Sequence, residues 1–312
     1  MLSVRLFGPP ALSAGELPVV LPRRKSRALA FYLAAQSQPV RREALLALFW
    51  PEAERAAAQQ TLRTTLHGLR KVLGEALVGD EETLALAPAV AVDARQLEAG
   101  LRAPGEAAGL AAVLALYRGD VVDGFDLPDA PAFAEWAAAE RERYRRLVSR
   151  GLTALSLQHE ARQDYGAALT ALEQALTFDP LQEDIQRAAL RLHYLAGDRA
   201  GAIRRYEQLR RLLDDELGVP PMAETRALYD AIITDTLARG PARPAVLRAA
   251  ARSAPTEAEP AGPERGFVPP FTGRAAELAA LHVLAAGNRV ALLEGEPGIG
   301  KSRLAAEFLR TT

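Results

Sequence analysis

Five residues near the end of the chain have the types and spacing of a phosphate-binding loop. The stretch GEPGIGKS, residues 295–302, matches the pattern G-x-x-x-x-G-K-[ST] at every position. In such a loop, glycines let backbone N–H groups wrap phosphate oxygens, the lysine reaches the β- and γ-phosphates, and the serine hydroxyl binds Mg²⁺. The residues that we expect to bind a nucleotide are therefore Gly295, Gly298, Gly300, Lys301 and Ser302.

The sequence around this loop supports a P-loop origin but leaves little room for catalysis. RVALLE (289–294) predicts the strand that leads in, and KSRLAAEFL (301–309) predicts the helix that leads out. The stretch FTGRAAEL (271–278) resembles the start of STAND-type signal-transducing ATPases. Only ten residues follow Ser302, so the acidic metal ligand and further strands of an ATPase have no place. We therefore expect no catalytic residues, no metal site and no enzyme activity in this chain, with ATP and Mg²⁺ as cofactors only of a longer form.

A helix predicted at residues 58–74 carries the second group of candidate binding residues. Its apolar side chains recur at helical spacing and form one stripe of Leu62, Leu66, Leu69 and Leu73. The opposite face holds hydrogen-bonding or cationic side chains and no carboxylate: Gln60, Arg63, Thr64, His67, Arg70 and Lys71. Arginine and glutamine can make paired hydrogen bonds to base edges, and lysine and threonine can bind phosphates. The face therefore favours nucleic-acid binding, with a merely solvated helix face as the alternative.

The elements around this helix predict a winged helix. SVRLFG (3–8) and LPVVLP (17–22) alternate like short strands, residues 23–36 and 41–50 predict two helices, and a hairpin turn falls at residues 79–82. Strands, three helices and a hairpin is the element order of winged-helix proteins. In helix-turn-helix proteins the second helix of the motif enters the major groove of DNA. The order therefore predicts that the polar face at 58–74 reads base edges.

Residues 1–93 resemble the OmpR-type winged helix of SARP-type transcriptional activators. The resemblance rests on RRKSRALAFYLA in the first helix, EALLALFWPE in the second and TLRTTLHGLRKVLG in the third. It implies that the recognition helix contains Arg63, Thr64, His67 and Lys71. It also implies that the basic start of the first helix approaches phosphates through Arg23, Arg24 and Lys25.

The tip of the predicted wing departs from what a DNA contact requires. Three consecutive acidic residues, Asp80, Glu81 and Glu82, form the turn. Carboxylates repel the phosphates of a nucleic acid. We therefore do not expect the wing to contact DNA.

Residues 94–238 predict an all-helical domain with an internal repeat. ARQDYGAALTALEQAL (161–176) matches LAGDRAGAIRRYEQLR (195–210) at an offset of 34 residues, which is the period of the tetratricopeptide repeat. A generic bundle of helical hairpins is the alternative. His159 and His193 fall within these helical patterns, and we expect them to be ordinary core or surface histidines rather than ligands.

The same region resembles the bacterial transcriptional activator domain, which follows the winged helix in the SARP family. The most diagnostic stretch is RRLLDDELGVPPMAETRALYDAI (210–232), in which a helix stops at a Gly-Val-Pro-Pro turn and another begins. The resemblance implies that the domain dimerises and contacts the transcription machinery. An excess of acidic over basic residues in this region suits protein partners.

Composition excludes several other classes of protein. The chain has 312 residues, a net charge of −1 and no cysteine, which rules out disulfides and thiolate chemistry. No apolar run approaches the ~20 residues of a membrane span, and the N-terminus lacks a signal-peptide pattern. Residues 239–268 are rich in Pro, Ala and charge and predict a flexible linker. We expect a cytoplasmic protein that does not bind membranes.

These patterns predict a mainly α protein with four segments. The segments are a winged-helix DNA-binding domain at 1–93, a TPR-like activator domain at 94–238, a linker at 239–268 and an incomplete P-loop α/β segment at 269–312. The favoured function is a sequence-specific transcriptional activator that binds double-stranded promoter DNA as a homodimer and recruits RNA polymerase. One alternative is a STAND-type ATP-dependent signalling switch in a longer form. Another is a TPR-type scaffold that binds proteins and no longer reads DNA.

Overall fold

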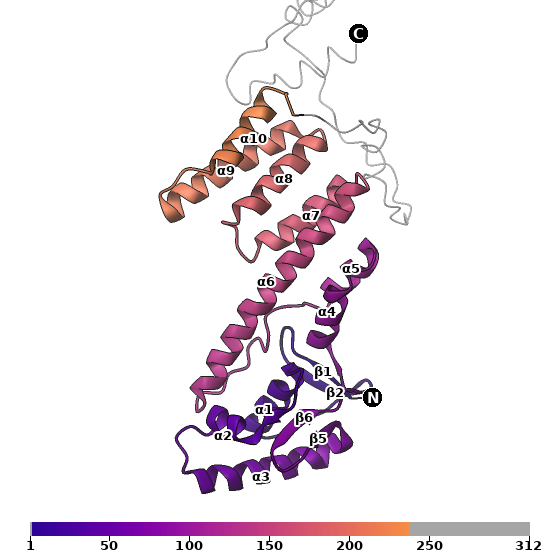
Figure 1. Ribbon diagram of the computed structural model, residues 1–312, viewed down its shortest axis with the longest axis vertical. Helices are drawn as coiled ribbons and strands as arrows, with labels where there is room; N and C mark the ends of the chain where they lie inside the picture. Colours follow the sequence, from indigo (N-terminus) through magenta and orange to yellow (C-terminus); the bar gives the residue numbers. More distant parts are fainter. Residues whose placement is uncertain (1, 238–312) are drawn as a thin grey trace, which may run out of the picture. The chain divides into compact units, whose positions relative to one another are not determined.

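The computed structural model describes residues 2–237, all within one compact unit, Met1–Arg243 (Figure 1). The predicted linker at 239–268 and the predicted P-loop segment at 269–312 lie outside the described residues. The described part is mainly helical and carries small sheets towards its N-terminal end, as the sequence predicts.

A four-stranded sheet begins the chain. Its strands are β1 (Leu2–Arg5), β2 (Ala11–Ala14), β3 (Leu17–Pro18) and β7 (Ala91–Val92), in the order β3-β2-β1-β7. β1 runs antiparallel to β2 and parallel to β7, so that Val4 lies opposite both Leu12 and Val92. All three side chains are buried, and this register therefore places one apolar face of the sheet in the core.

The expected strands are shorter than the sequence pattern indicates. The strand predicted at 3–8 ends at Arg5, since the N–H groups of Leu6 and Phe7 leave the ladder and donate to the Asp93 carboxylate. The strand predicted at 17–22 reduces to the two residues of β3. Alternation alone therefore overestimates strand length here, because a distant carboxylate competes for the backbone donors.

Three helices and a second sheet complete the front of the unit. They are α1 (Arg24–Ala35), α2 (Arg42–Phe49), α3 (Arg55–Leu73), the 3₁₀ turn η1 (Gly74–Ala76), and strands β4 (Val40–Arg41), β5 (Leu77–Gly79) and β6 (Thr83–Leu86). The sheet order is β4-β6-β5. The first two helices lie within one residue of the predicted bounds, and α3 begins three residues before the predicted start at 58. β5 and β6 form the predicted hairpin.

After β7, all the regular elements of the described residues are helices. They are α4 (Asp93–Arg102), α5 (Ala107–Leu114), α6 (Pro131–Ala161), α7 (Tyr165–Leu176), α8 (Glu183–Leu195), α9 (Arg199–Leu217) and α10 (Ala223–Ile233). From α6 to α9, each helix packs against the next one along the chain (Figure 1). The long α6 begins with a proline at its first position, where the missing N–H costs nothing.

The 34-residue offset seen in the sequence has a structural counterpart in the starts of α7 and α9. Asp164 caps α7 by accepting a hydrogen bond from Ala167 N at 3.2 Å, and Asp198 caps α9 by accepting one from Gly201 N at 2.9 Å. The residue before each cap has a positive φ, at Gln163 and at Gly197. The two helical hairpins are thus built by the same local geometry.

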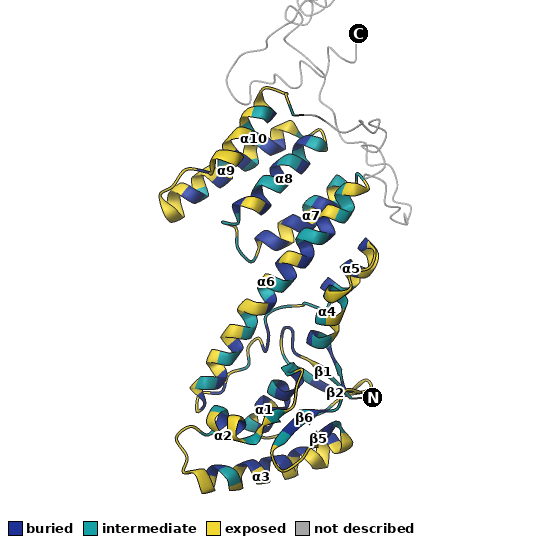
Figure 2. Cartoon of the chain, in the orientation of Figure 1, coloured by how far each residue is buried: buried dark blue, intermediate teal, exposed yellow. Residues whose placement is uncertain are grey.

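One hydrophobic core joins the front of the unit to the helices. Its buried residues extend along the chain from Val4 to Leu192, and a second, smaller cluster holds Leu190, Tyr194, Ala202, Tyr206 and Ile232. Figure 2 shows buried residues in both the front of the unit and the helices. Aromatic pairs span the junction: Phe31 with Phe125, Tyr32 with Trp136, and Phe49 with Phe133, at ring-centroid distances of 5.4, 4.9 and 5.7 Å. Such pairs add to the stabilisation from buried area. α1 and α2 are therefore held firmly against α6.

Candidate nucleic-acid interface

α3 exposes one polar face because its apolar residues are spaced for the core. The side chains of Leu62, Leu66, Leu69 and Leu73 are buried, as the stripe in the sequence predicts. The helix packs on α1 and α2 and lies at the end of the unit farthest from α9 and α10 (Figure 1). It ends at Gly74, whose φ of 54° disfavours any side chain.

All six predicted contact residues of α3 are exposed (Figure 2). They are Gln60, Arg63, Thr64, His67, Arg70 and Lys71. Within residues 2–237, none of the four basic side chains in this set forms an ion pair. Most arginines of α6 are, by contrast, paired with carboxylates. α3 thus presents unneutralised cations on one face, which is the charge that phosphates attract.

The basic start of α1 has a different environment. Arg23 is exposed and has no ion pair with the rest of the described chain. Arg24 forms an ion pair with Asp126 and donates from Nε to the Asp126 carbonyl at 2.9 Å. Lys25 Nζ lies 2.9 Å from the Asp129 carboxylate and stands over the Trp50 ring. Two of the three cations that the resemblance assigns to phosphates are therefore partly neutralised by the segment that precedes α6.

Of the three carboxylates at the acidic wing tip, one has a structural role and the other two are exposed to solvent. Asp80 Oδ1 accepts hydrogen bonds from the N–H groups of Glu82 and Thr83 at 2.8 and 2.7 Å, and these bonds, that of Thr83 foremost, lower the pKa of Asp80. Asp80 therefore closes the hairpin turn in the manner of an Asx turn. Glu81 and Glu82 are exposed and remain as negative charges at the tip. The sequence contains a signal for this role, which the sequence analysis did not use: Thr83 lies three residues after Asp80 in a predicted hairpin turn.

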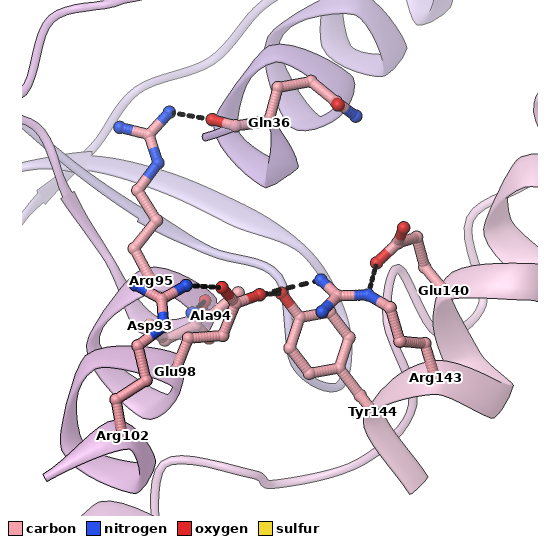
Figure 3. A network of polar contacts seen from close by, with 9 residues as sticks. All are labelled: Gln36, Asp93, Ala94, Arg95, Glu98, Arg102, Glu140, Arg143 and Tyr144. Carbon is pink, nitrogen blue, oxygen red and sulfur yellow. Dashed lines mark hydrogen bonds and ion pairs between the residues drawn. The ribbon is translucent and has the colours of Figure 1, made fainter. Parts of the chain in front are cut away.

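A polar network fixes α4 between the front sheet and α6 (Figure 3). The Asp93 carboxylate accepts hydrogen bonds from the N–H groups of Leu6, Phe7 and Ala94 at 2.8 to 3.1 Å. Burial raises the pKa of Asp93, against the opposing effect of these hydrogen bonds. Asp93 therefore joins the end of β1 to the start of α4.

The second half of this network centres on Glu98. Its Oε1 accepts from Tyr144 Oη and Arg143 Nη2, both at 2.7 Å, and its Oε2 accepts from Arg102 Nη2 at 3.1 Å (Figure 3). Burial raises the pKa of Glu98, but the bonds from Arg143 and Tyr144 outweigh it and hold the pKa below its ordinary value. Arg95 also donates from Nη2 to the Gln36 carbonyl at 2.8 Å, which links α4 to the end of α1. Of these partners only Arg102, four residues after Glu98 on the same helix, is predictable from local sequence.

Other site classes find no support among the described residues. Residues 2–237 contain no group of three or more His, Asp or Glu side chains placed to share a metal ion. No helix in the same range combines the length and apolar composition that a membrane span requires. The predicted nucleotide-binding residues lie outside the described residues: Gly295, Gly298, Gly300, Lys301 and Ser302.

The two histidines of the helical repeat have structural roles. His159 Nδ1 lies 3.7 Å from the carboxylate of Asp164, and His193 Nδ1 lies 3.2 Å from that of Asp198. Each histidine therefore faces the capping residue of the helix that follows. A His and an Asp five residues apart, repeated after 34 residues, was the sequence signal for this arrangement.

Comparison with known proteins gives a family match for the helical region and relatives that cover most of the chain. Residues 84–233 match the family model of the bacterial transcriptional activator domain. The transcriptional regulatory protein EmbR of Mycobacterium tuberculosis is 28% identical over 254 residues, a match that covers 74% of this chain and 63% of that protein. The regulatory protein AfsR of Streptomyces griseus is 30% identical over 277 residues, covering 84% of this chain and 27% of that protein.

A solved structure supports the same relationship. The structure of M. tuberculosis EmbR in complex with a low-affinity phosphopeptide superimposes with a TM-score of 0.61 at 26% identity, covering 75% of this chain and 65% of that one. The chain thus spans less than two thirds of EmbR and about a quarter of AfsR. Residues 84–233 are thus similar to the bacterial transcriptional activator domain, and the chain is similar to proteins named as bacterial regulatory proteins.

Proposed function

We propose that this protein is a sequence-specific DNA-binding transcriptional activator, with α3 as the helix that enters the major groove. The observation that carries the proposal is the exposed face of α3, whose four basic side chains have no carboxylate partner in the described chain. Unpaired cations on a helix of 19 residues supply the phosphate attraction that brings a protein onto DNA. EmbR is named a transcriptional regulatory protein and AfsR a regulatory protein, which agrees with this use.

Each type of side chain on α3 has a specific task in this proposal. Arg63 and Gln60 lie one turn apart, and their paired hydrogen-bonding groups suit guanine and adenine edges. Lys71 suits phosphate oxygens, which position the helix without reading sequence. The Thr64 hydroxyl donates to the Gln60 carbonyl at 3.0 Å and must leave that acceptor to bind phosphate. Glu81 and Glu82 keep the wing tip away from the phosphate backbone, so α3 and the start of α1 carry the DNA contact.

The helical region serves protein partners in this proposal. At the turn between α9 and α10, the side chains of Leu217, Val219 and Met222 are 57%, 44% and 58% exposed. Large apolar side chains clustered on a surface favour protein association. We assign this region to homodimerisation and to contact with RNA polymerase in the cytoplasm, with no catalytic step. ATP and Mg²⁺ remain expected cofactors of a longer form only.

Salt-dependent binding tests the proposal directly. The 312-residue protein is titrated by fluorescence anisotropy against labelled promoter fragments from its own genome, at several salt concentrations. We expect tight binding to particular fragments, with log K falling in proportion to log salt by roughly 0.9 for each phosphate contact. Equally weak binding to every fragment would instead favour a protein scaffold, the reading that the free carboxylates of Glu81 and Glu82 support.

A further inference from the structure

Gly68 lies in the middle of α3 on its exposed side, and no contact within residues 2–237 explains the absence of a side chain. Glycine is an unfavourable residue in a helix interior because its backbone loses more freedom on folding than that of alanine. The φ of Gly68 is not positive, so alanine could adopt the same backbone. A Cβ built at Gly68 would meet no atom within 4 Å. The fold therefore tolerates a side chain here, and the sequence still has none.

Three other glycines of the described helices have close neighbours within the chain, whereas Gly109 of α5 and Gly166 of α7 do not. A Cβ at Gly100 would lie 2.4 Å from Val113 Cγ2, and one at Gly151 would lie 2.8 Å from Leu114 Cδ2. A Cβ at Gly201 would lie 2.0 Å from the capping carboxylate of Asp198. Close packing thus excludes a side chain at these three positions. Gly109 of α5 resembles Gly68 in having open space around it, but α5 contains no cationic residue.

The position of Gly68 around the helix indicates what approaches it. At about 100° per residue, the six polar side chains of α3 cover an arc of about 120°, from Arg70 to Thr64. Gly68 lies about 40° beyond Thr64, at the border of this arc opposite Arg70. A helix in a major groove faces base edges with its centre and the two sugar-phosphate strands with its sides. Gly68 therefore lies where one strand would pass.

We propose that Gly68 is a close-approach position at which the sugar-phosphate backbone of bound DNA lies against the main chain of α3. An α-helix with side chains is about 10–12 Å wide and the major groove about 12 Å wide, so clearance at the sides is small. Thr64, four residues before, and Lys71, three residues after, flank the bare surface. The Lys71 ammonium binds phosphate on one side of it, and the Thr64 hydroxyl on the other side is turned to the Gln60 carbonyl, to which it donates at 3.0 Å. This inference rests on the proposed function and adds a steric requirement to it.

Gly68→Ala separates this role from a structural one. Alanine stabilises an exposed helix, so we expect Tm to rise by roughly 2–4 °C. We expect DNA affinity to fall by roughly tenfold at the same time, because the added methyl group meets the DNA backbone. Since the sugar-phosphate backbone is the same in every DNA sequence, the loss of affinity should be equal for promoter and unrelated fragments. Anisotropy titrations and thermal unfolding of the full chain measure both effects.

Gly109→Ala is the matched control. It should raise Tm in the same way and leave DNA affinity unchanged, because α5 is not part of the interface. Unchanged or tighter binding by Gly68→Ala, with the wild type still binding DNA, would refute the close approach while leaving the proposed function intact. A loss of affinity confined to promoter fragments would refute the proposal that Gly68 contacts the sugar-phosphate backbone of DNA. Failure of the wild type itself to bind DNA would remove both proposals.

Discussion

Lys25 of α1 and Asp129, two residues before α6, form an ion pair at 2.9 Å across the junction between the front of the unit and the helices. The Lys25 ammonium also donates to the Phe49 carbonyl at 2.8 Å and is only 23% exposed, whereas the Asp129 side chain is 64% exposed. The neighbouring pair of Arg24 and Asp126 repeats the arrangement. Two carboxylates of one segment therefore occupy cations that DNA phosphates could otherwise bind.

Replacing both Asp126 and Asp129 by asparagine should tighten DNA binding. If Arg24 and Lys25 reach phosphates, the double variant frees two cations, and the slope of log K against log salt should steepen by about two. Asp123→Asn is the control, because Asp123 is exposed in the same segment and forms no ion pair with the described residues. The control removes one negative charge and the double variant two, so a gain in log K half as large in the control would show that only the net charge matters and that Arg24 and Lys25 do not contact DNA.

The Arg63→Ala variant tests the assignment of α3 to the major groove. Removing a guanidinium from a base edge should lower the affinity for the specific promoter by roughly 1–3 kcal/mol. Arg211→Ala removes an equally exposed arginine of α9 that has no ion pair in the described chain, and it should leave affinity unchanged. Anisotropy titrations with the specific fragment give both values. Wild-type affinity in Arg63→Ala would place this residue outside the interface.

The parts of the structure that sequence predicts well are those set by periodicity. The leucine stripe of α3 determines which side chains are buried. The prediction of the exposed face, which follows from the stripe, is therefore also confirmed. Gly74 and Pro131 mark the end of α3 and the start of α6 for reasons that are local to the backbone. Whether the exposed residues bind DNA stays a prediction.

The parts that sequence does not predict depend on partners far along the chain. The segment before α6 pairs with α1 through Arg24 and Asp126, which are 102 residues apart. The early end of β1 depends on Asp93, which is 87 residues from Leu6. Neither partner has a local signature. The sequence around Asp126 resembles that of any loop aspartate, and the sequence around Asp93 resembles that of any aspartate at the start of a helix. The environment of Arg24 and Lys25 could therefore be found only from the structure.

The cap of α9 should contribute measurable stability that depends on pH. Asp198 accepts from Gly201 N, and this bond first, followed by the contact with His193, lowers the pKa of Asp198. A lowered folded-state pKa means that the stabilisation is present above the unfolded pKa and is lost as pH falls through the folded value. Asp198→Ala should therefore cost about 0.5–2 kcal/mol at neutral pH, and less in acid. Urea unfolding at several pH values measures the difference.

Asp164 offers the internal comparison for this cap. Its hydrogen bond to Ala167 N is longer, at 3.2 Å, and its histidine partner is farther away, at 3.7 Å. Asp164→Ala should accordingly cost less than Asp198→Ala. Asp198→Asn keeps an acceptor without the charge, so its stability should fall between wild type and alanine. Equal stability of all three Asp198 forms would contradict a capping role.

The Tyr144→Phe variant tests the network that holds α4 to α6. The Tyr144 hydroxyl is buried and donates to Glu98 Oε1 at 2.7 Å, so its removal takes one partner from a half-buried carboxylate. We expect a loss of about 1–3 kcal/mol in the free energy of unfolding, measured with urea. Tyr165→Phe should change little, because the Tyr165 hydroxyl makes no hydrogen bond among the described residues. A neutral Tyr144→Phe would mean that Arg143 and Arg102 alone satisfy Glu98.

The same tyrosine should make the protein sensitive to alkali. Burial first, and then the bond to Glu98, raise the pKa of Tyr144 well above its ordinary value. Above pH ~10 the phenol ionises in the unfolded chain but keeps its proton in the folded one. The unfolded state then binds fewer protons, so stability falls as pH rises. Unfolding followed by phenolate absorbance should show this fall in the wild type and a smaller one in Tyr144→Phe. The remainder comes from the other tyrosines whose pKa burial raises, which are Tyr32, Tyr117, Tyr206 and Tyr229. Identical alkaline profiles for the two proteins would mean that Tyr144 ionises without unfolding.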